Sequence, residues 1–334
     1  MSSSARGQYI IGVDLGGTNI AAGAMSLDGA QHVAMQSIPT NSSLGDEGVA
    51  ERIIGLVDRV ILDTMEATGA ARRDFIGVGI GAPGPLDRER GIVIVAPNLG
   101  WTNFPLRDRI HQGLGLPATL DNDANCATFG EWWQGAGRGS NNLVGLTIGT
   151  GIGGGLILNG SLYHGASDVA GEIGHTTIDV NGRHCKCGSY GCLEAYASGP
   201  AIATRAREIM VREEGESVIP SMVHGRLDQI TAQTVYDAAK AGDEVASEIV
   251  RDTARYLGAG IANLLNIFNP DTVVVAGGVT AAGDALFGPL QREVRRRAFS
   301  PAVDAVRIVP GELPGTAGVV GAVASFKQQH LGGV

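Results

Sequence analysis

Residues 9–27 read YIIGVDLGGTNIAAGAMSL, which is an apolar run, a glycine turn and a second apolar run. In a dinucleotide-binding unit such a turn opens a helix, whose N-terminus binds the pyrophosphate. Residues 20–27 are instead small and β-compatible and continue as a strand, which excludes a Rossmann unit. The stretch predicts a β-hairpin whose turn, Gly16, Gly17 and Thr18, offers backbone N–H groups and a hydroxyl to phosphate oxygens.

The same hairpin places a carboxylate, Asp14, at the end of its first strand. An ordinary hairpin would account for the glycines but gives no reason for this carboxylate. Carboxylate oxygens are hard ligands that hold magnesium directly or through water. We therefore expect Asp14 to hold Mg²⁺ beside the phosphates of a bound nucleotide.

A second stretch, residues 143–158, reads LVGLTIGTGIGGGLIL and repeats the pattern of strand, glycine turn and strand. It contains a literal GxGxxG motif, but the apolar residues after it again continue as a strand, so no helix N-terminus is available. Two such hairpins in different halves of the chain indicate an internal duplication. We expect Gly149, Thr150 and Gly151 to bind phosphate from the second half, so that two related α/β halves close on one nucleotide.

A third stretch, residues 121–125, reads DNDAN between a short apolar strand and a helix. Either Asn122 or Asp123 can cap that helix, but a single cap does not require so many polar residues. The crowding favours the rim of an active site. A carboxylate placed there can act as a general base toward a substrate hydroxyl, and Asp123 is our candidate.

A fourth stretch, residues 174–194, reads GHTTIDVNGRHCKCGSYGCLE and holds three of the four cysteines of the chain. Thiolates this close can surround one soft divalent ion, and the glycines among them allow tight turns. A disulfide with one free thiol is the alternative, but Cys185 and Cys187 are too close for an easy bridge. Tetrahedral zinc needs a fourth ligand, and we favour His175 over His184, which directly precedes Cys185 and points away from it.

Apolar spacing outside these stretches predicts helices over 46–68, 193–211 and 243–268. Gly69 is the expected C-cap of the first and Asp243 the expected N-cap of the last. Residues 217–227 read as a loop. An apolar strand at 272–276 leads into Gly277 and Gly278.

The composition bounds the class of protein. The chain has 334 residues and a net charge of −9, and no basic face is evident, which argues against nucleic acid as a partner. No apolar run approaches the ~20 residues of a membrane span, and the start lacks the apolar region of a signal peptide. Cysteine use is sparse and typical of metal binding, so we expect a cytoplasmic protein without a membrane partner.

The stretch at 174–194 resembles the signature of the ROK family of bacterial sugar kinases and sugar-responsive repressors, Gly-His followed by Cys-x-Cys-Gly-x-x-Gly-Cys-x-Glu. The match is position for position, and the resemblance covers essentially the whole chain. It implies a structural zinc held by His175, Cys185, Cys187 and Cys192. One departure is Asn19, where many relatives carry a basic residue, so backbone donors and magnesium would carry more of the phosphate charge.

The resemblance also implies a sugar site. Glu172, His175 and Glu194 face the sugar, Asn122 binds it and Asp123 takes the role of general base. Asn98 lies in a segment that resembles the sugar-proximal Pro-Asn turn of the family. For Gly277 and Gly278, a plain strand-to-helix turn explains the sequence nearly as well, and the resemblance favours an adenine-binding surface.

Fold and function follow as expectations. The duplication and the resemblance both predict an α/β, actin/hexokinase-like (ribonuclease H-like) fold of two lobes with a cleft between them. We expect residues 1–122 and about 312–334 to form the small lobe, and residues 123–311 the large lobe with the zinc loop and the adenine-side turn. We expect a homodimer or homotetramer that binds a hexose and Mg-ATP.

The expected activity is the ATP-dependent phosphorylation of glucose to glucose 6-phosphate. Alternative sugars are N-acetylmannosamine, N-acetylglucosamine, mannose, allose and fructose, because related sites differ by few contacts. A sugar-sensing repressor is a further alternative, but such proteins carry a DNA-binding domain before the first hairpin, and only about eight residues precede it here. An actin-like assembly protein would need neither the zinc loop nor the pair Asn122 and Asp123.

Overall fold

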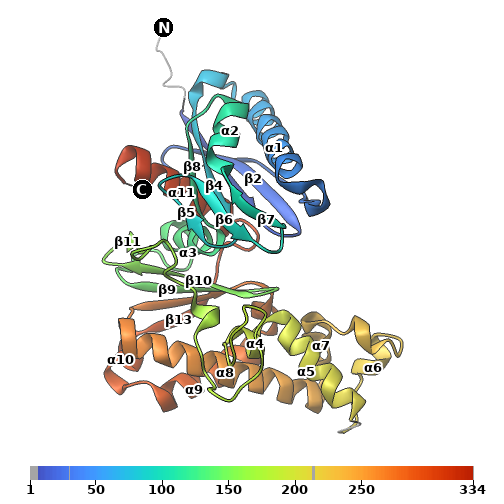
Figure 1. Cartoon of the computed structure of the whole chain (residues 1–334). Coiled ribbons are helices and arrows are strands. Elements are labelled where there is room, and N and C mark those ends of the chain that lie inside the picture. Colours follow the sequence, from blue (N-terminus) through green and yellow to red (C-terminus); the bar gives the residue numbers. More distant parts are fainter. Residues whose placement is uncertain (1–6, 30, 213–214, 334) are drawn as a thin grey trace.

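The computed structural model describes residues 7–29, 31–212 and 215–333. Two five-stranded sheets dominate the molecule, each with helices packed against it, and the chain completes the first sheet before it enters the second (Figure 1). The last helix returns to pack against the first sheet.

The first sheet has the strand order β3-β2-β1-β4-β8. Its strands are β1 (Tyr9–Leu15), β2 (Asn19–Ser26), β3 (His32–Pro39), β4 (Phe75–Ala82) and β8 (Ala118–Asn122). β1 pairs antiparallel with β2, which confirms the predicted hairpin, whereas β4 and β8 run parallel to β1. The register sets Asp14 beside Gly81 and Gly81 beside Asp121, so the polar ends of β1 and β8 lie at the same edge of the sheet.

The second sheet has the strand order β11-β10-β9-β12-β13. Its strands are β9 (Leu143–Ile148), β10 (Ile152–Leu158), β11 (Ser161–Leu162), β12 (Thr272–Ala276) and β13 (Arg307–Pro310). Three antiparallel strands followed by two parallel strands repeat the topology of the first sheet strand for strand. The predicted duplication of an α/β unit is confirmed.

A small antiparallel sheet extends the first half beyond the end of β4. Its strands are β5 (Leu86–Asp87), β6 (Ile92–Ala96) and β7 (Trp101–Phe104). The tight turn between β6 and β7 carries Asn98, and the N–H of Leu99 closes it by donating to the carbonyl oxygen of Ala96 at 2.9 Å. This sheet therefore positions the Pro-Asn turn singled out in the sequence.

Each large sheet has its own core. The first joins β1, β2 and β4 to helices α1 (Gly45–Thr68) and α2 (Leu106–Leu114). The second joins β9, β10 and β12 to a larger set of helices. The helices of the second half are α4 (Glu194–Ala197), α5 (Gly199–Val211), α6 (Ile219–Met222), α7 (Ala232–Lys240), α8 (Glu244–Phe268), α9 (Asp284–Arg297) and α10 (Ser300–Ala305).

A pair of helices connects the two sheets (Figure 1). α11 (Ala317–Leu331) packs against β1, β4 and α3 (Asp123–Gln134), and α3 packs against β9 and β10. The two helix backbones touch where they cross, because a Cβ at Gly321 would lie 1.6 Å from the carbonyl oxygen of Cys126. Only glycine fits at such a crossing.

Two helix caps predicted from the sequence are confirmed, and two predicted segments differ from the structure. Gly69 ends α1 in the left-handed conformation, and the Asp243 carboxylate caps α8 by accepting from the N–H of Ala246 at 2.7 Å. The helix predicted over 193–211 is confirmed except at Ser198, which divides it into α4 and α5 and caps the second. The loop predicted at 217–227 contains the short helix α6.

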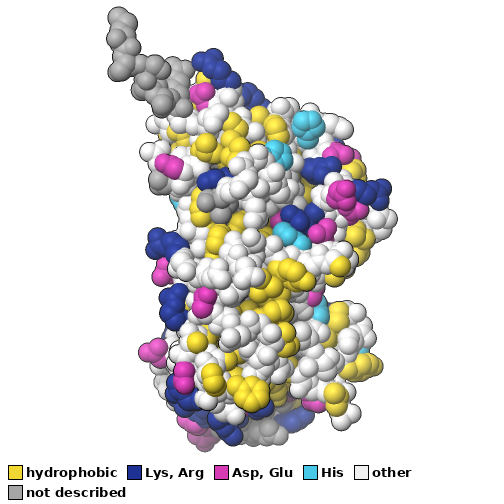
Figure 2. Space-filling model, turned by 90° about the vertical axis from the view of Figure 1, so that its left-hand side faces the viewer, with side chains coloured by type: hydrophobic (Ala, Val, Ile, Leu, Met, Phe, Trp, Pro, Cys, Tyr) yellow, Lys and Arg dark blue, Asp and Glu magenta, His cyan; other side chains and the backbone are white. Residues whose placement is uncertain are grey.

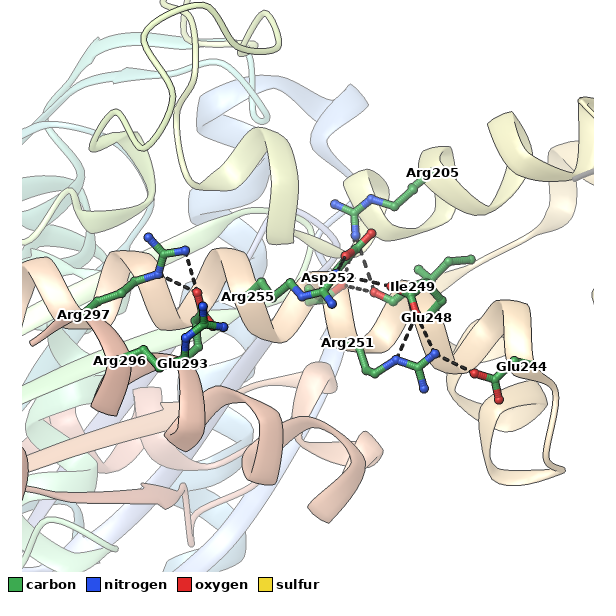
Figure 3. Close-up of polar contacts among 11 residues, drawn as sticks. Arg205, Glu244, Glu248, Ile249, Arg251, Asp252, Arg255, Glu293, Arg296 and Arg297 are labelled. Atoms are coloured by element: carbon green, nitrogen blue, oxygen red, sulfur yellow. Dashed lines mark hydrogen bonds and ion pairs between the residues drawn. The ribbon is translucent and has the colours of Figure 1, made fainter.

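Figure 3 shows two kinds of arginine around α8. Exposed Arg251 pairs with Glu244 at 2.6 Å and with Glu248 at 2.5 Å. Buried Arg205 of α5 instead donates to the carbonyl oxygen of Tyr196 at 2.6 Å. Exposed ion pairs contribute little to the free energy of unfolding. Removing one partner of a buried hydrogen bond costs more, because the other partner is left buried without a hydrogen bond.

The surface is mixed in character. Figure 2 shows acidic and basic side chains interspersed over one face, and an indentation between the upper and lower halves of the molecule. Within the described part of the chain, no helix is both long enough and apolar enough to cross a membrane.

Candidate active site

A cleft of about 760 Å³ lies where the two halves meet. Its lining includes most of the site residues predicted from the sequence. They are Gly17, Asn98, Asn122, Asp123, Gly149, Thr150, Gly151, Glu172, His175, Glu194 and Gly277, together with Cys187. Segments separated by more than 100 residues in the sequence therefore meet around one cavity.

Asn122 and Asp123 begin α3 at the end of β8. The side-chain oxygen of Asn122 caps the helix by accepting from the N–H groups of Ala124 at 2.9 Å and Asn125 at 3.1 Å. The capping alternative is thus correct for Asn122. Its amide nitrogen donates to the carbonyl oxygen of Gly84 at 3.5 Å, which leaves a second N–H for a ligand.

The electrostatics of Asp123 suit a base. Burial, with a smaller contribution from the nearby Glu172 carboxylate, raises the pKa of its carboxyl to about 6, although the hydrogen bond from the Ala124 N–H lowers it. A carboxylate with this pKa is ionised at neutral pH and still accepts a proton readily.

One glycine turn from each half of the chain borders the cleft. In the first turn the N–H of Gly16 donates to the carbonyl oxygen of Asn19 at 2.9 Å, Gly17 borders the cleft, and Thr18 lies exposed beside it. In the second turn the N–H of Gly149 donates to the carbonyl oxygen of Gly151 at 2.9 Å. Both turns have the tight form that the sequence predicts for a phosphate-binding hairpin.

Asp14 borders a neighbouring cavity of about 570 Å³, which Thr147, Gly277 and Gly278 also line. Burial, followed by the charge of Asp123, raises the pKa of Asp14 to about 7. Among the described residues, no cationic side chain contributes to the pKa of this carboxylate. A buried carboxylate without a cationic side chain fits a magnesium ligand, because Mg²⁺ would compensate its charge.

The cysteine stretch forms a compact group of donors. His175, Cys185, Cys187 and Cys192 place their ligand atoms within 4.8 Å of one another. The Sγ atoms of Cys187 and Cys192 lie 3.8 Å apart, and the Sγ of Cys185 lies 3.8 Å from the Nδ1 of His175. Thiolates bound to zinc at about 2.3 Å in a tetrahedron lie about 3.8 Å apart, so the group fits this ion.

His184 takes no part in this group, as expected, and its ring packs edge-on against Tyr190. The Nε2 of His175 points instead toward the cleft and lies 4.0 Å from the carboxylate of Glu172. With Nδ1 on the metal, Nε2 would carry the proton and act as a donor. The metal group thus orients a ring that lines the cleft.

Glu194 connects the cysteine stretch to the second glycine turn. Its carboxylate accepts from the N–H of Ile152 at 2.9 Å, and its Oε1 lies 3.9 Å from the Sγ of Cys185. Glu194 begins α4, and at the start of the next helix, α5, the N–H of Gly199 donates to the carbonyl oxygen of Gly149 at 2.9 Å. The break at Ser198, absent from the sequence prediction, therefore secures the turn.

A third cavity, of about 440 Å³, opens beside the second turn and Gly278. Sequence reasoning missed its other lining residues, which come from α5 and α7. They include Pro200, Ala203, Arg207, Gln233 and Tyr236. These positions show only ordinary helical periodicity, and no local signal separates them from a packed helix face. The hydroxyl of Tyr236 is buried there without a hydrogen-bond partner among the described residues.

Comparison with known proteins is consistent with this site. Residues 10–329 match the ROK family, to which this chain therefore belongs. A glucokinase from Halalkalibacterium halodurans is 39% identical over 325 residues, which cover 97% of this chain and 96% of that protein. A ROK family glucokinase from Streptomyces griseus, solved in complex with glucose and AMPPNP, is 36% identical with a TM-score of 0.80 and covers 94% of this chain and 98% of its own.

The family also contains regulators. A xylose repressor from Caldicellulosiruptor bescii is 33% identical over 284 residues, which cover 85% of this chain and 70% of that protein. The matches to the two glucokinases extend over nearly the full length of both partners, whereas the match to the repressor leaves part of the repressor unmatched.

Proposed function

We propose that this chain transfers the terminal phosphoryl group of Mg-ATP to glucose and forms glucose 6-phosphate. The observation that carries this proposal is the cleft, which brings a carboxylate with a pKa of about 6 to the same cavity as both glycine turns. The similarity to glucokinases over nearly the whole chain supports the choice of sugar.

In this proposal Asp123 accepts the proton of the 6-hydroxyl as that oxygen attacks the phosphorus. Its carboxylate is suited to this step because burial has already removed part of its hydration. Asn122 offers its amide N–H groups, and Glu172 and Glu194 offer carboxylate oxygens. Sugar hydroxyls both donate and accept, so a site with amides and carboxylates can hold them in one orientation.

The phosphate side uses the backbone. The N–H groups of the turns at 16–18 and 149–151 would surround the phosphates, and the glycine surface at 277–278 would accept adenine. Magnesium, held by Asp14, would neutralise charge on the phosphates. Zinc, held by the three cysteines and His175, would supply structural support to the sugar side of the cleft.

Other hexoses and N-acetylhexosamines remain the alternatives to glucose, because few contacts distinguish them. A sugar-responsive regulator is the alternative from a different class, and it is supported by the repressor relatives. A regulator would bind the sugar without consuming ATP, so turnover separates the two classes.

We further propose that the enzyme acts in the cytoplasm as a homodimer or homotetramer, with the hexose and ATP as its partners and with neither nucleic acid nor membrane. The division into lobes near residues 122 and 311 belongs to the same proposal. It is supported by the helix pair α3 and α11, which joins the two sheets.

A coupled assay of ADP release with a panel of hexoses tests the activity. The panel contains glucose, mannose, fructose, allose and both N-acetylhexosamines, each over a range of concentrations. We expect the highest kcat/KM with glucose. ATP-independent sugar binding without ADP release would contradict the proposal, and a higher kcat/KM for another sugar would move the assignment to that sugar.

A further inference from the structure

A buried polar cluster lies directly behind the sugar side of the cleft. Its centre is Asp121, which is 1% exposed and immediately precedes Asn122. The Asp121 carboxylate accepts from the backbone N–H of Asn122 at 2.9 Å and from the hydroxyl of Ser325 in α11 at 2.9 Å. Its position relative to the active-site strand end is therefore set by two elements, β8 and α11.

Two further side chains reach the same carboxylate. The Nε2 of His164 lies 3.0 Å from Oδ2 and 3.2 Å from Oδ1 of Asp121, and Nη2 of Arg88 lies 3.3 Å from Oδ2. A carboxylate only accepts, so Nε2 of His164 carries the proton. Burial by itself would raise the pKa of Asp121, but His164, Arg88 and Ser325 outweigh it and lower the pKa.

Arg88 also holds a loop of the second half. Its backbone N–H donates to Oδ2 of Asp168 at 3.2 Å, and Nη1 lies 3.6 Å from Oδ1 of the same carboxylate. Asp168 adopts a left-handed conformation with φ 58°, which a non-glycine residue keeps only when its surroundings hold it there. We call Arg88, Asp121, His164 and Asp168 the Asp121 clamp.

The clamp joins two segments that both line the cleft. His164 and Asp168 belong to the loop that follows β11 and leads to Glu172, whereas Arg88 and Asp121 belong to the first half of the chain. The Glu172 carboxylate opposes the ionised form of Asp123. Glu172 belongs to the second half of the chain and repels Asp123 at the start of α3. Attractive contacts elsewhere must therefore hold the two segments together.

We propose that Arg88 and His164 are positioning residues for sugar phosphorylation, which hold the Glu172 loop against the strand end carrying Asn122 and Asp123. This inference rests on the proposed function of the cleft. Neither side chain acts on the sugar; each acts through Asp121 or Asp168. The pairs are effective because the shared carboxylate is buried and its attractions are weakly screened.

The test uses variants that open the clamp and a matched control from the same turn. Arg88→Met and His164→Leu remove one contact each, and His164→Gln keeps a side-chain N–H donor. Arg90→Ala removes a neighbouring arginine that is 74% exposed and lies outside the clamp. KM for glucose, KM for ATP, kcat and the melting temperature are measured on each.

We expect kcat/KM for glucose to fall on the order of 10–100-fold in Arg88→Met and His164→Leu, because displacements of about 1 Å can cost about 10²-fold. KM for ATP should stay within about twofold, since the glycine turns lie elsewhere. His164→Gln should recover most of the loss, and Arg90→Ala should match the parent. In the variant that combines Arg88→Met with His164→Leu, the fold decrease in kcat/KM for glucose should be smaller than the product of the two single decreases, because both side chains act through Asp121.

Three results would overturn the inference. They are unchanged glucose kinetics in the two clamp variants, equal losses for glucose and ATP, and a His164→Gln variant as weak as His164→Leu. Calorimetric titration measures the affinity of the parent and of the clamp variants for glucose in the absence of turnover. A parent that binds glucose but releases no ADP would defeat the proposed function, while equal glucose affinity in parent and clamp variants would defeat the clamp.

Discussion

At the scale of single residues, the environment of Asp123 matters more than its identity. The carboxyl is half-buried at the start of α3, lies near Glu172 and accepts a hydrogen bond from the N–H of Ala124. Asp121, two residues earlier, has a different environment, because His164, Arg88 and Ser325 lower its pKa. One short stretch thus holds an ion-paired carboxylate with a structural role and a carboxylate suited to catalysis.

Replacing the proposed base tests this assignment. We expect Asp123→Ala to fold and bind glucose, and to lose about 10²–10⁴-fold in kcat, the usual contribution of a general base. Exposed Asp108→Ala serves as the control for loss of a carboxylate. Turnover near that of the parent enzyme would remove Asp123 from the mechanism.

The pKa of Asp123 predicts the acid limb of the pH profile. The base must be ionised, and burial raises its pKa to about 6. We therefore expect kcat/KM for the sugar to be constant above this pH and to fall about tenfold per unit below it. Circular dichroism at each pH controls for unfolding. A flat profile down to pH 5 in a folded enzyme would contradict the assignment.

At the scale of elements, the cysteine stretch places three of its residues, His175, Cys187 and Glu194, in the lining of the cleft. It orients His175 and, through Glu194, contacts the second turn. The stretch has few regular elements of its own, so donor atoms rather than packing must hold its shape.

Removing one thiolate should therefore loosen the sugar site. We expect Cys187→Ser to lower zinc content and to raise KM for glucose about 10–100-fold, with a smaller change in KM for ATP. Serine binds zinc poorly at neutral pH. Zinc content, circular dichroism and both KM values are measured on one preparation, and an unaltered sugar constant in a folded, zinc-free variant would show that the stretch is a remote support.

The arginines around α8 allow a matched test of stability. Arg205→Ala leaves the Tyr196 carbonyl oxygen without its donor and opens a cavity, so we expect a loss of about 2–4 kcal/mol in the free energy of unfolding. Arg251→Ala removes an exposed network and should cost less than about 1 kcal/mol. Denaturant unfolding measures both, and equal losses would contradict the argument.

At the scale of the whole molecule, the site lies between two similar halves connected by α3 and α11. The glycine turns belong to different sheets, and the cleft separates them. Substrates that contact both halves favour a closed form over an open one.

Closure is measurable in solution. We expect the radius of gyration from small-angle scattering to decrease when glucose and a non-hydrolysable ATP analogue are added together, and to change less with either alone. The Asp123→Ala variant, which keeps its binding groups, should close like the parent. An unchanged radius under saturation would contradict closure.

The sequence by itself determined the features that depend on neighbouring residues. The hairpin at Asp14 to Thr18, its repeat at 149–151 and the donor group of the cysteine stretch are all confirmed, because each is encoded within about twenty residues. The sequence left a helix cap at Asn122 or Asp123 open as the alternative to an active-site role, and Asn122 is the cap.

Only the tertiary structure decided what these features meet. The Asp121 clamp joins His164 to Asp121 across 43 positions and Arg88 to Asp168 across 80 positions, and the cavity beside Gly278 is lined by helices with ordinary periodicity. Next to the break at Ser198, the N–H of Gly199 donates to the carbonyl oxygen of Gly149, which lies 50 positions earlier in the chain (199 − 149). Periodicity in the sequence identifies which face of a helix or strand is apolar, but it does not say which distant element packs against that face. Such contacts are therefore known only from the tertiary structure.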